Sequence, residues 1–392
     1  MIQLIRAITL VGLLAALPAQ AVYAPIPEQE QGKDLTLSLR GGLAHDSNIF
    51  GSATNEIDSW VWTLAPRAAY NVSLTDQTFL SAAYALTLDQ FDNRPGDKLL
   101  DSHDVSVRVA HAFSKVTTID VSDVFTVSRN PESLLPGRTL NTNQSFTRNQ
   151  LDGRFSTPVN AKAGVTAKAR SVYFDYHDSD LGRSLDRTES LFGLSGDYAV
   201  LPQTKAVGEY RHQEVAYRNR GGTKDKTSDY LMAGADHELA QKISVSGRLG
   251  VEWRKRKSER DTTSPYAEFS AKYSYTQKSF LAGGYAYTID ETSDPDRFTD
   301  AKAHRLFVNV QHAVTPLIVA SGSVSYEPST LEGRVSLANI SERTVRAGAA
   351  LSYLPTKNWV TSASIDHDRV RSDEPSRKLK RARVSLSATF TF

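Results

Sequence analysis

Apolar and polar residues alternate one by one along most of the chain, which is the pattern of a β-strand with two unlike faces. Between Ser59 and Leu74, one face carries Trp60, Trp62, Leu64, Ala68, Tyr70 and Val72. Residues 242–254 and 343–353 repeat this pattern. Such segments are longer than the roughly 5 to 6 residues of an average globular strand and match the roughly 9 to 11 of a tilted membrane-spanning strand. The pattern therefore predicts transmembrane β-strands rather than a soluble sandwich.

The connections between these strands alternate between short and long. We expect eight short turns, around residues 75–77, 114–115, 158–160, 201–203, 240–241, 276–278, 315–316 and 355–357. Longer polar stretches separate them, including residues 45–58, 130–143, 177–187, 218–227, 291–301 and 328–342. This asymmetry is typical of outer-membrane barrels, whose long loops lie outside the cell. It predicts an all-β fold, a transmembrane antiparallel β-barrel of about 18 strands with both termini in the periplasm.

One predicted strand, residues 145–157, departs from the alternation. Its apolar residues Phe146, Leu151 and Phe155 do not fall on one face. A β-bulge inserts one extra residue and would account for such a change of phase. We therefore expect a bulge in this strand.

The first 24 residues have the features of a secretory signal peptide. Arg6 precedes an uncharged run from Ala7 to Leu17, and two small-residue cleavage candidates follow it. This run is too short to cross a hydrocarbon layer of about 30 Å as a helix. We expect cleavage after Ala21 or Ala24, a short periplasmic segment at residues 25–33 and a single barrel over residues 34–392.

The chain ends on an aromatic residue at the close of an alternating strand. Val384, Leu386, Ala388, Phe390 and Phe392 share one face of that strand. A terminal strand of this kind resembles the signal by which the barrel assembly machinery recognises outer-membrane proteins. We expect Phe390 and Phe392 to form this assembly signal.

The polar face of the strands predicts the lining of the lumen, where arginines are interleaved with Asp and Glu. The candidate lumen-lining arginines are Arg40, Arg67, Arg108, Arg170, Arg211, Arg248, Arg254, Arg305, Arg346, Arg381 and Arg383. Opposite charges on neighbouring strands stabilise a sheet as cross-strand pairs. We expect most of these charges to pair in this way, and the small cationic excess to suit an anionic solute. A barrel of roughly 16 to 18 strands leaves an aqueous channel unless loops fill it.

Composition and loop chemistry argue against several other classes of protein. The chain has no Cys, so neither disulfides nor thiolate metal sites contribute to the fold. A formal net charge of +2 is too small to indicate nucleic-acid binding. The predicted loops contain carboxylates, among them Asp46, Asp294 and Asp296, without a catalytic spacing, and we interpret them as solvated. We expect no enzymatic activity, no cofactor and no bound metal.

The first predicted strand carries a short motif at its end. It runs from Leu39 through Arg40 and Gly41 to His45 and continues into Asp46-Ser47-Asn48-Ile49-Phe50. A first strand that leads into Asp-Ser-Asn-Ile-aromatic resembles the putative β-barrel porin 2 family. The resemblance implies an unplugged outer-membrane barrel without catalytic residues. Some members of the family look like outer-membrane conduits for exopolysaccharide export that work with periplasmic partners.

The sequence leaves two main functional interpretations. The first is an outer-membrane channel for hydrophilic solutes, including the conduit for exopolysaccharide export. The second is a structural or adhesive barrel whose lumen is closed by its own loops, for which residues 130–143 and 328–342 are long enough. In both cases we expect the outer membrane of a Gram-negative bacterium, contact with outer-membrane lipids and lipopolysaccharide, and assembly by the barrel assembly machinery. An exporter would add periplasmic polysaccharide-export proteins as partners, and no interpretation involves nucleic acid.

Overall fold

The computed structural model describes residues 35–129, 145–219, 223–240, 242–292, 294–334 and 336–392. Over these residues it contains 18 strands, each paired antiparallel with its neighbours in chain order. The last strand pairs with the first, so the sheet closes on itself. Closure removes the unpaired edges that an open sheet exposes. The structure confirms the predicted fold class and the predicted number of strands.

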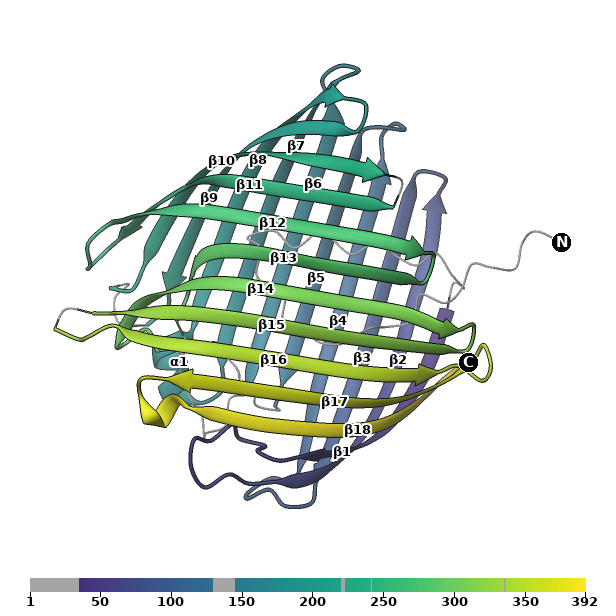
Figure 1. Cartoon of the computed structure of the whole chain (residues 1–392), viewed down its shortest axis with the longest axis vertical. Coiled ribbons are helices and arrows are strands. Elements are labelled where there is room, and N and C mark those ends of the chain that lie inside the picture. Colours follow the sequence, from purple (N-terminus) through teal and green to yellow (C-terminus); the bar gives the residue numbers. More distant parts are fainter. Residues whose placement is uncertain (1–34, 130–144, 220–222, 241, 293, 335) are drawn as a thin grey trace.

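The strands, labelled in Figure 1, are β1 (Leu35–Asp46), β2 (Ser59–Thr75), β3 (Thr78–Phe91), β4 (Leu99–Ala112), β5 (Thr118–Ser128), β6 (Phe146–Pro158), β7 (Ala163–Tyr176), β8 (Arg187–Leu201), β9 (Thr204–Tyr217), β10 (Lys226–Ala240), β11 (Ile243–Arg256), β12 (Thr262–Thr276), β13 (Ser279–Asp290), β14 (Phe298–Thr315), β15 (Ile318–Gly333), β16 (Ile340–Tyr353), β17 (Trp359–Ser372) and β18 (Leu379–Thr391). Two short helices, α1 (Ser179–Leu185) and η2 (Pro375–Arg377), lie in connections. No helix in the described part of the chain is long and apolar enough to cross a membrane.

The two ends of the barrel differ in the length of their connections. Tight turns join β2 to β3, β8 to β9 and β14 to β15 at one end, which we call the turn end. β18 finishes there beside the start of β1, and the Phe392 amide donates a hydrogen bond to the Leu37 carbonyl at 2.8 Å. The opposite end, the loop end, carries α1, η2 and longer connections such as residues 47–58. The predicted alternation of short and long connections is confirmed.

Two predicted loops are shorter in the structure than in the prediction. β15 and β16 continue until only residues 334–339 connect them, instead of residues 328–342. β14 likewise begins at Phe298, inside the predicted loop 291–301. The strands extend because Phe298 and Leu331 pack into a buried apolar cluster at the loop end.

Three predicted segments lie outside the described residues. They are the signal peptide at residues 1–24, the periplasmic segment at residues 25–33 and the loop at residues 130–143. Each of them stays a prediction.

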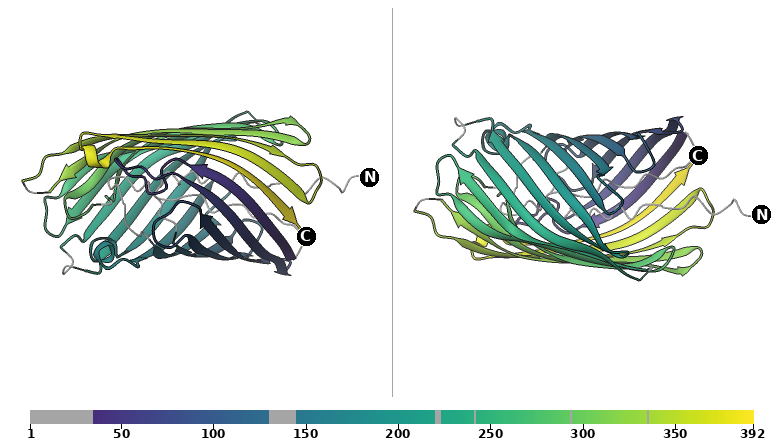
Figure 2. Two further views of the ribbon diagram at one scale, coloured as in Figure 1. Left: turned by 90° about the horizontal axis from the view of Figure 1, so that it is seen from below. Right: turned by 90° about the horizontal axis from the view of Figure 1, so that it is seen from above.

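The barrel is flattened, so that the wall of β10 to β18 faces the wall of β1 to β9 (Figure 2).

Glycines allow the backbones of β10 and β11 to approach each other closely. A Cβ atom at Gly234 would lie 1.9 Å from the carbonyl oxygen of Gly247, and one at Gly250 would lie 2.2 Å from that of Leu231. Only a residue without a Cβ atom permits such a close approach of two backbones.

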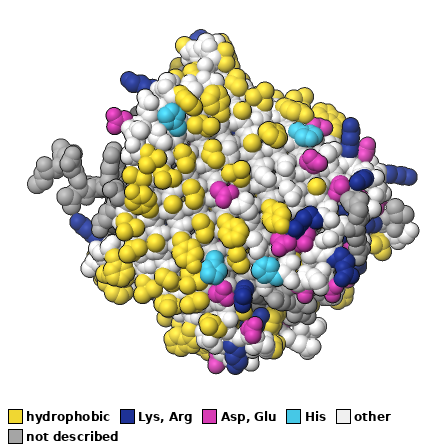
Figure 3. Space-filling model, turned by 180° about the vertical axis from the view of Figure 1, so that it is seen from behind, with side chains coloured by type: hydrophobic (Ala, Val, Ile, Leu, Met, Phe, Trp, Pro, Cys, Tyr) yellow, Lys and Arg dark blue, Asp and Glu magenta, His cyan; other side chains and the backbone are white. Residues whose placement is uncertain are grey.

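The outer face of the barrel carries a broad apolar belt (Figure 3). Large apolar side chains, among them Phe192, Leu249 and Leu386, are exposed on it. A patch of this extent marks contact with other apolar groups rather than with water. In membrane barrels the corresponding band lies against the lipid tails.

β6 shows why the alternation fails in this part of the sequence. The strand pairs with β5 and β7 without a shift of register, so the predicted bulge is wrong. Leu151 and Phe155 are exposed on the outer face. Phe146 instead faces inward and packs against the cluster of Tyr176 and Leu181. An apolar residue that a loop helix covers inside the barrel therefore breaks the pattern.

We expect Leu249→Arg to lower the free energy of unfolding by about 2 to 4 kcal/mol, the cost of an arginine on the lipid face near the membrane midplane. Leu249 lies in the middle of β11 and is 70% exposed on the apolar belt. Unfolding titrations in lipid vesicles measure this loss. Ser244→Arg is the matched control, because Ser244 is an exposed residue of the opposite, inward face of β11. Equal losses in the two variants would mean that the faces are assigned wrongly.

Candidate functional site

The arginines predicted to line the lumen all lie on strands, at positions that alternate with the outward apolar residues. In the described part of the chain, these arginines make the following carboxylate contacts: Arg108 with Asp120 at 2.8 Å, Arg170 with Asp152 at 2.5 Å, Arg211 with Glu209 at 2.7 Å, Arg248 with Asp236 at 2.8 Å, Arg254 with Glu252 at 2.8 Å, Arg305 with Glu327 at 2.7 Å, Arg381 with Asp46 at 3.0 Å and Arg383 with Asp46 at 3.3 Å. Arg346 lies in register with Asp368 on the neighbouring strand. Such pairs stabilise the inner face and neutralise much of its charge.

Arg40 and Arg67 differ from this group. They lie on the neighbouring strands β1 and β2, and both are exposed. Neither has an ion-pair partner among the described residues. Together with Arg154 on the inward phase of β6, they place exposed positive charge on the inner face.

A network of buried charges crosses the interior at the loop end. It consists of Lys226 from β10, Arg254 and Arg256 from β11, Asp300 from β14 and Glu291 from the loop before β14, and we call it the loop-end network. Asp300, which is 0% exposed, contacts Lys226 at 2.9 Å, Arg254 at 2.5 Å, and Arg256. Glu291 contacts Lys226 at 2.9 Å. The network thus joins three strands and one loop across the interior.

A local irregularity of β14 aims Asp300 into this network. The pairing of β14 with β15 shifts its register between Phe298 and Ala301. An extra residue in one strand turns the side chains around it. The same segment offers the Thr299 carbonyl, which accepts a hydrogen bond from Lys226 Nζ at 2.8 Å. The bulge therefore brings a carboxylate and a carbonyl oxygen to the buried cations.

Two carboxylates in the loops have pKa values below their ordinary range. Burial opposes the ionisation of Glu291, but Lys226 and Arg254 together outweigh it and lower the pKa. Glu374 accepts a hydrogen bond from Arg297 at 3.1 Å, and this bond lowers its pKa. A carboxylate with a lowered pKa stabilises the fold above its unfolded-state pKa, and this contribution is lost as the pH falls through the folded-state value. These loop contacts therefore contribute to stability at neutral pH.

Helix α1 lies inside the barrel at the loop end, against the wall of β6 and β7. Asp178 caps it, since its carboxylate accepts a hydrogen bond from the Leu181 amide at 3.0 Å. Leu181 and Leu185 are each 2% exposed and pack against Tyr176, with Phe174 at the edge of the cluster. Tyr176 and Phe174 share the inward phase of β7 with Arg170. The connection between β7 and β8 thus folds inward instead of outward.

Polar contacts hold α1 from its other side. The Ser184 carbonyl accepts a hydrogen bond from Lys224 Nζ at 3.1 Å, and the Ser184 hydroxyl donates to Asp296. Lys224 also pairs with Asp296 at 2.7 Å, and Asn219 donates to the Gly182 carbonyl at 3.0 Å. The interpretation of Asp296 as a solvated loop carboxylate is therefore wrong, because it holds α1 to the loop before β14.

The motif at residues 46–50 fastens the first loop to the last strand. Asp46 is buried and accepts hydrogen bonds from Arg381 at 3.0 Å and from the Asn48 amide at 3.0 Å. Asn48 Nδ2 donates to the Lys380 carbonyl at 3.1 Å. Asp46, too, was interpreted from the sequence as a solvated carboxylate, and this is wrong. Because β1 and β18 close the barrel, these bonds tie the motif to the closing seam.

Ile49, which follows Asn48 in this motif, directs the first loop inward. Ile49 is buried in a cluster with Val61, Phe91 and Leu100 of the loop ends of β2, β3 and β4. A loop that projected into water would leave Ile49 exposed. Both α1 and the first loop therefore cover part of the inner face at the loop end.

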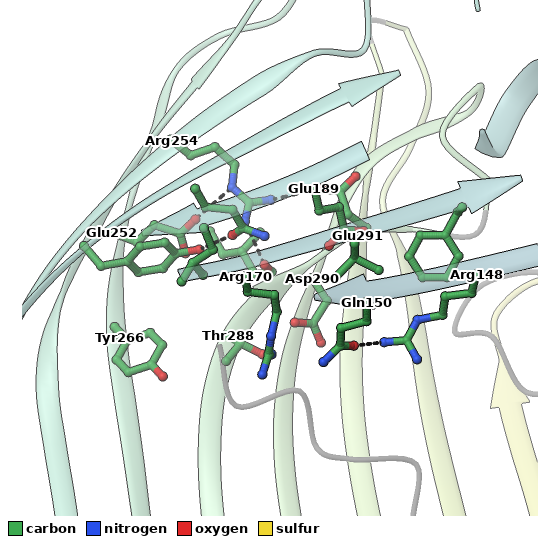
Figure 4. A pocket seen from close by; sticks show the side chains of 16 residues that line it. Arg148, Gln150, Arg170, Glu189, Glu252, Arg254, Tyr266, Thr288, Asp290 and Glu291 are labelled. Atoms are coloured by element: carbon green, nitrogen blue, oxygen red, sulfur yellow. Dashed lines mark hydrogen bonds and ion pairs between the residues drawn. The ribbon is translucent and has the colours of Figure 1, made fainter. Parts of the chain in front are cut away.

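A cavity of about 110 Å³ lies beside the loop-end network (Figure 4). Both walls of the barrel line it, with Arg148, Gln150 and Arg170 on one side and Glu252, Arg254 and Asp290 on the other. It has room for several water molecules, but it is smaller than the roughly 300 Å³ of the smallest typical ligand pockets. A second cavity of about 470 Å³ lies toward the turn end and is lined in part by Lys205, Asp236, Ser246 and Lys272. The described cavity beside the loop-end network is thus the smaller of these two.

Several residues of this site were not singled out from the sequence. Lys226 continues the inward phase of Ser228 and Tyr230, so the alternation of β10 contained a signal for it. Asp300 lies within the bulge in β14, where alternation no longer predicts direction. Glu291 lies in a connection, and no periodic pattern places it.

The predicted assembly residues lie at the turn end. Phe390 has its ring centroid 5.1 Å from that of Trp359 on β17 and 4.7 Å from that of Phe392. Phe392 is exposed on the outer side. Their role as an assembly signal stays a prediction.

Comparisons with known proteins place the chain among barrels. A family model described as "Putative beta-barrel porin 2" matches residues 160–392. No curated protein matches the chain. The solved siderophore receptor PirA from Pseudomonas aeruginosa is 10% identical, with a TM-score of 0.47 over 92% of this chain and 80% of PirA.

Two solved structures match over nearly their whole length. A BenF-like porin from Pseudomonas fluorescens Pf-5 is 11% identical, with a TM-score of 0.48 over 92% of this chain and 98% of that porin. OpdK from Pseudomonas aeruginosa, solved with vanillate, is 10% identical, with a TM-score of 0.49 over 92% and 99% of the two chains. At these values the likenesses carry no inference about cargo.

Proposed function

The chain belongs to the putative beta-barrel porin 2 family, and we propose that it is a non-catalytic channel for hydrophilic solutes in the outer membrane. A closed sheet satisfies every backbone group within a bilayer, and the apolar belt suits contact with lipid. The observation that carries the proposal is the inner face, which is lined by arginines and carboxylates paired across strands. Charged residues in a membrane protein face the interior or a water-filled path.

We propose that the turn end faces the periplasm and that the loop end faces outward. Bacterial outer-membrane barrels have short periplasmic turns and longer extracellular loops. The chain reaches β1 and leaves β18 at the turn end, beside the short turns. This orientation supports the predicted periplasmic position of both termini.

The exposed arginines suggest a preference for anionic solutes. Arg40 and Arg67 are exposed on the inward phase, whereas most other arginines of the inner face contact carboxylates. Unpaired cations along a narrow aqueous path raise the local concentration of anions. We therefore expect a modest anion selectivity, to which these two side chains contribute.

Besides small hydrophilic solutes, we propose exopolysaccharide as a larger cargo of this channel, with periplasmic export proteins as partners. The proposal rests on the family resemblance and on the hydrophilic inner face. α1 and the loop-end network occupy part of the interior at the loop end. Export along this side of the interior would therefore require α1 and the network to move aside.

A barrel closed by its own loops is the second candidate function. The observation that favours it is the inward packing of α1 and of the first loop, whose residues Leu181, Leu185 and Ile49 are buried. Such packing is stable only while the loops stay inside. A structural or adhesive barrel would keep this arrangement permanently, whereas a gated channel would release it.

Single-channel recording of the refolded protein in planar bilayers tests the channel proposal. We expect discrete ohmic steps with a weak preference for anions. Replacing Arg40 and Arg67 together by Glu should shift the selectivity toward cations, because both side chains lie on the inner face. Arg129→Glu is the matched control, since Arg129 is an exposed residue of the loop end that contacts Asp101. No conductance from a folded barrel would favour the loop-closed alternative.

A further inference from the structure

Four cationic side chains gather on the outward face at the loop end of β16, β17 and β18, which lie side by side in Figure 1. We call them the cationic patch: Arg343 on β16, Arg369 and Arg371 on β17, and Lys380 on β18. All four are exposed. They belong to the same phase as the apolar belt, so their side chains lie on the membrane side of the wall rather than in the lumen.

The patch places like charges directly opposite each other. Arg343 is in register with Arg371, and Arg369 is in register with Lys380. Like charges at opposed positions of neighbouring strands destabilise a sheet. An anion that lies among the side chains would relieve this repulsion.

No residue of the patch has an ion pair within the described residues. Asp373 is the neighbouring carboxylate in the loop after β17, and it accepts a hydrogen bond from the Ser341 amide at 3.0 Å. The described residues therefore offer little negative charge to balance the four cations of the patch.

Three other cations at the loop end have carboxylate partners. Lys302 contacts Glu332 at 2.5 Å, Arg129 contacts Asp101 at 3.4 Å and Lys257 contacts Asp225 at 3.6 Å. The cationic patch differs from these three positions, because none of its four cations has an ion pair within the described residues. An external anion would supply the missing partner.

The position of the patch indicates what kind of anion this is. Toward the turn end the same outward phase continues into Ile365, Val384 and Leu386, which are exposed residues of the apolar belt. The patch therefore lies at the border between the lipid tails and the loops, where the headgroups of a leaflet are found. Arginine binds phosphate through two parallel hydrogen bonds, which suits a phosphorylated headgroup.

We propose that the cationic patch binds the phosphates of a diphosphorylated glycolipid of the lipid A class in the outer leaflet. The phosphates lie among Arg343, Arg369, Arg371 and Lys380, and the acyl chains run along the apolar residues below them. This inference rests on the proposed outward position of the loop end, but it does not rest on the channel proposal.

Binding of diphosphorylated lipid A to the purified barrel in detergent tests the proposal. In the variant with Arg343→Gln, Arg369→Gln, Arg371→Gln and Lys380→Gln, we expect the affinity to fall at least about tenfold, since several charge-assisted hydrogen bonds are lost. A matched control carries Arg129→Gln, Lys257→Gln and Lys302→Gln, which remove cations that already have carboxylate partners, and it should bind as the unmodified barrel does. Binding should weaken as salt is added, because the contacts are ionic.

Further measurements distinguish lipid from a free anion. Lipid A without its phosphates should bind the unmodified barrel weakly, and inorganic phosphate should compete poorly because it lacks the acyl chains. Equal affinity of the patch variant and the control, or efficient competition by inorganic phosphate, would overturn the proposal. Heat-modifiable gel mobility verifies folding, and the pair Arg369→Gln with Lys380→Gln replaces the full variant if that does not fold. Single-channel conductance should be unchanged in the variant, which separates this site from the lumen.

Discussion

Asp300→Ala should lower the free energy of unfolding by about 3 to 5 kcal/mol, the range observed when one partner of a buried ion pair is removed. The carboxylate is fully buried and contacts Lys226, Arg254 and Arg256. Glu291 would then be the remaining acid of the loop-end network and would face three cations. Lys226 keeps its contact with Glu291, and Arg254 keeps its contact with Glu252 at 2.8 Å.

Denaturant titrations in lipid vesicles, followed by Trp fluorescence and by heat-modifiable gel mobility, measure this loss. Asp236→Ala is the matched control, because Asp236 also pairs with an arginine, Arg248, at 2.8 Å, but its side chain is 44% exposed. Water compensates the charge left behind at an exposed site, and the cost of breaking an exposed pair is about 1 kcal/mol or less. Similar losses in the two variants would show that burial of the loop-end network does not increase its contribution to the free energy of unfolding.

The strand pattern could be predicted because a membrane barrel exposes each strand to two very different surroundings. Lipid selects apolar residues such as Leu249 and Leu386 on one side, and the interior selects polar residues such as Arg248 and Arg383 on the other. Alternation of this kind is local, so it can be read from the residues of a single strand. The short turns interrupt it at regular intervals, which is why the number of strands was also predictable.

The inward-folding loops could not be predicted in the same way. Phe146 was misinterpreted as a sign of a bulge because its apolar partner, α1, comes from a connection more than one strand away. The real bulge, near Asp300, left no trace in the alternation. Asp46 and Asp296 were interpreted as solvated because a carboxylate in a loop usually is. Their cationic partners Arg381 and Lys224 are distant in the sequence or lie in another loop.

The short motif at residues 46–50 illustrates the difference between a signature and its physical role. These residues carry the family resemblance in the sequence. The sequence alone does not show what they do in the structure. In the structure, Asp46 and Asn48 bind to β18 across the seam that closes the barrel, and Ile49 packs inside it. The motif therefore couples closure of the barrel to the inward direction of its first loop.

Replacing Leu181 and Leu185 together by Asp should release α1 from the inner wall and increase the single-channel conductance. Each leucine is 2% exposed, and loss of one buried leucine typically costs about 2 to 5 kcal/mol. A helix as short as α1 is not stable by itself in water, so it depends on this packing. Carboxylates at these positions would lie against Tyr176 and Phe174, where they have no water.

The barrel itself should remain folded in this variant, because α1 lies in a connection and contributes no strand pairing. Arg183→Asp on the same helix is the matched control, since the Arg183 side chain is 59% exposed and pairs only with the exposed Asp180 among the described residues. Limited proteolysis in the connection between β7 and β8 reports whether the helix has left the wall. A conductance that rises together with cleavage identifies α1 as an obstruction of the channel. Cleavage without a change in conductance would mean that solutes pass along another part of the interior, beside the exposed Arg40 and Arg67 on β1 and β2.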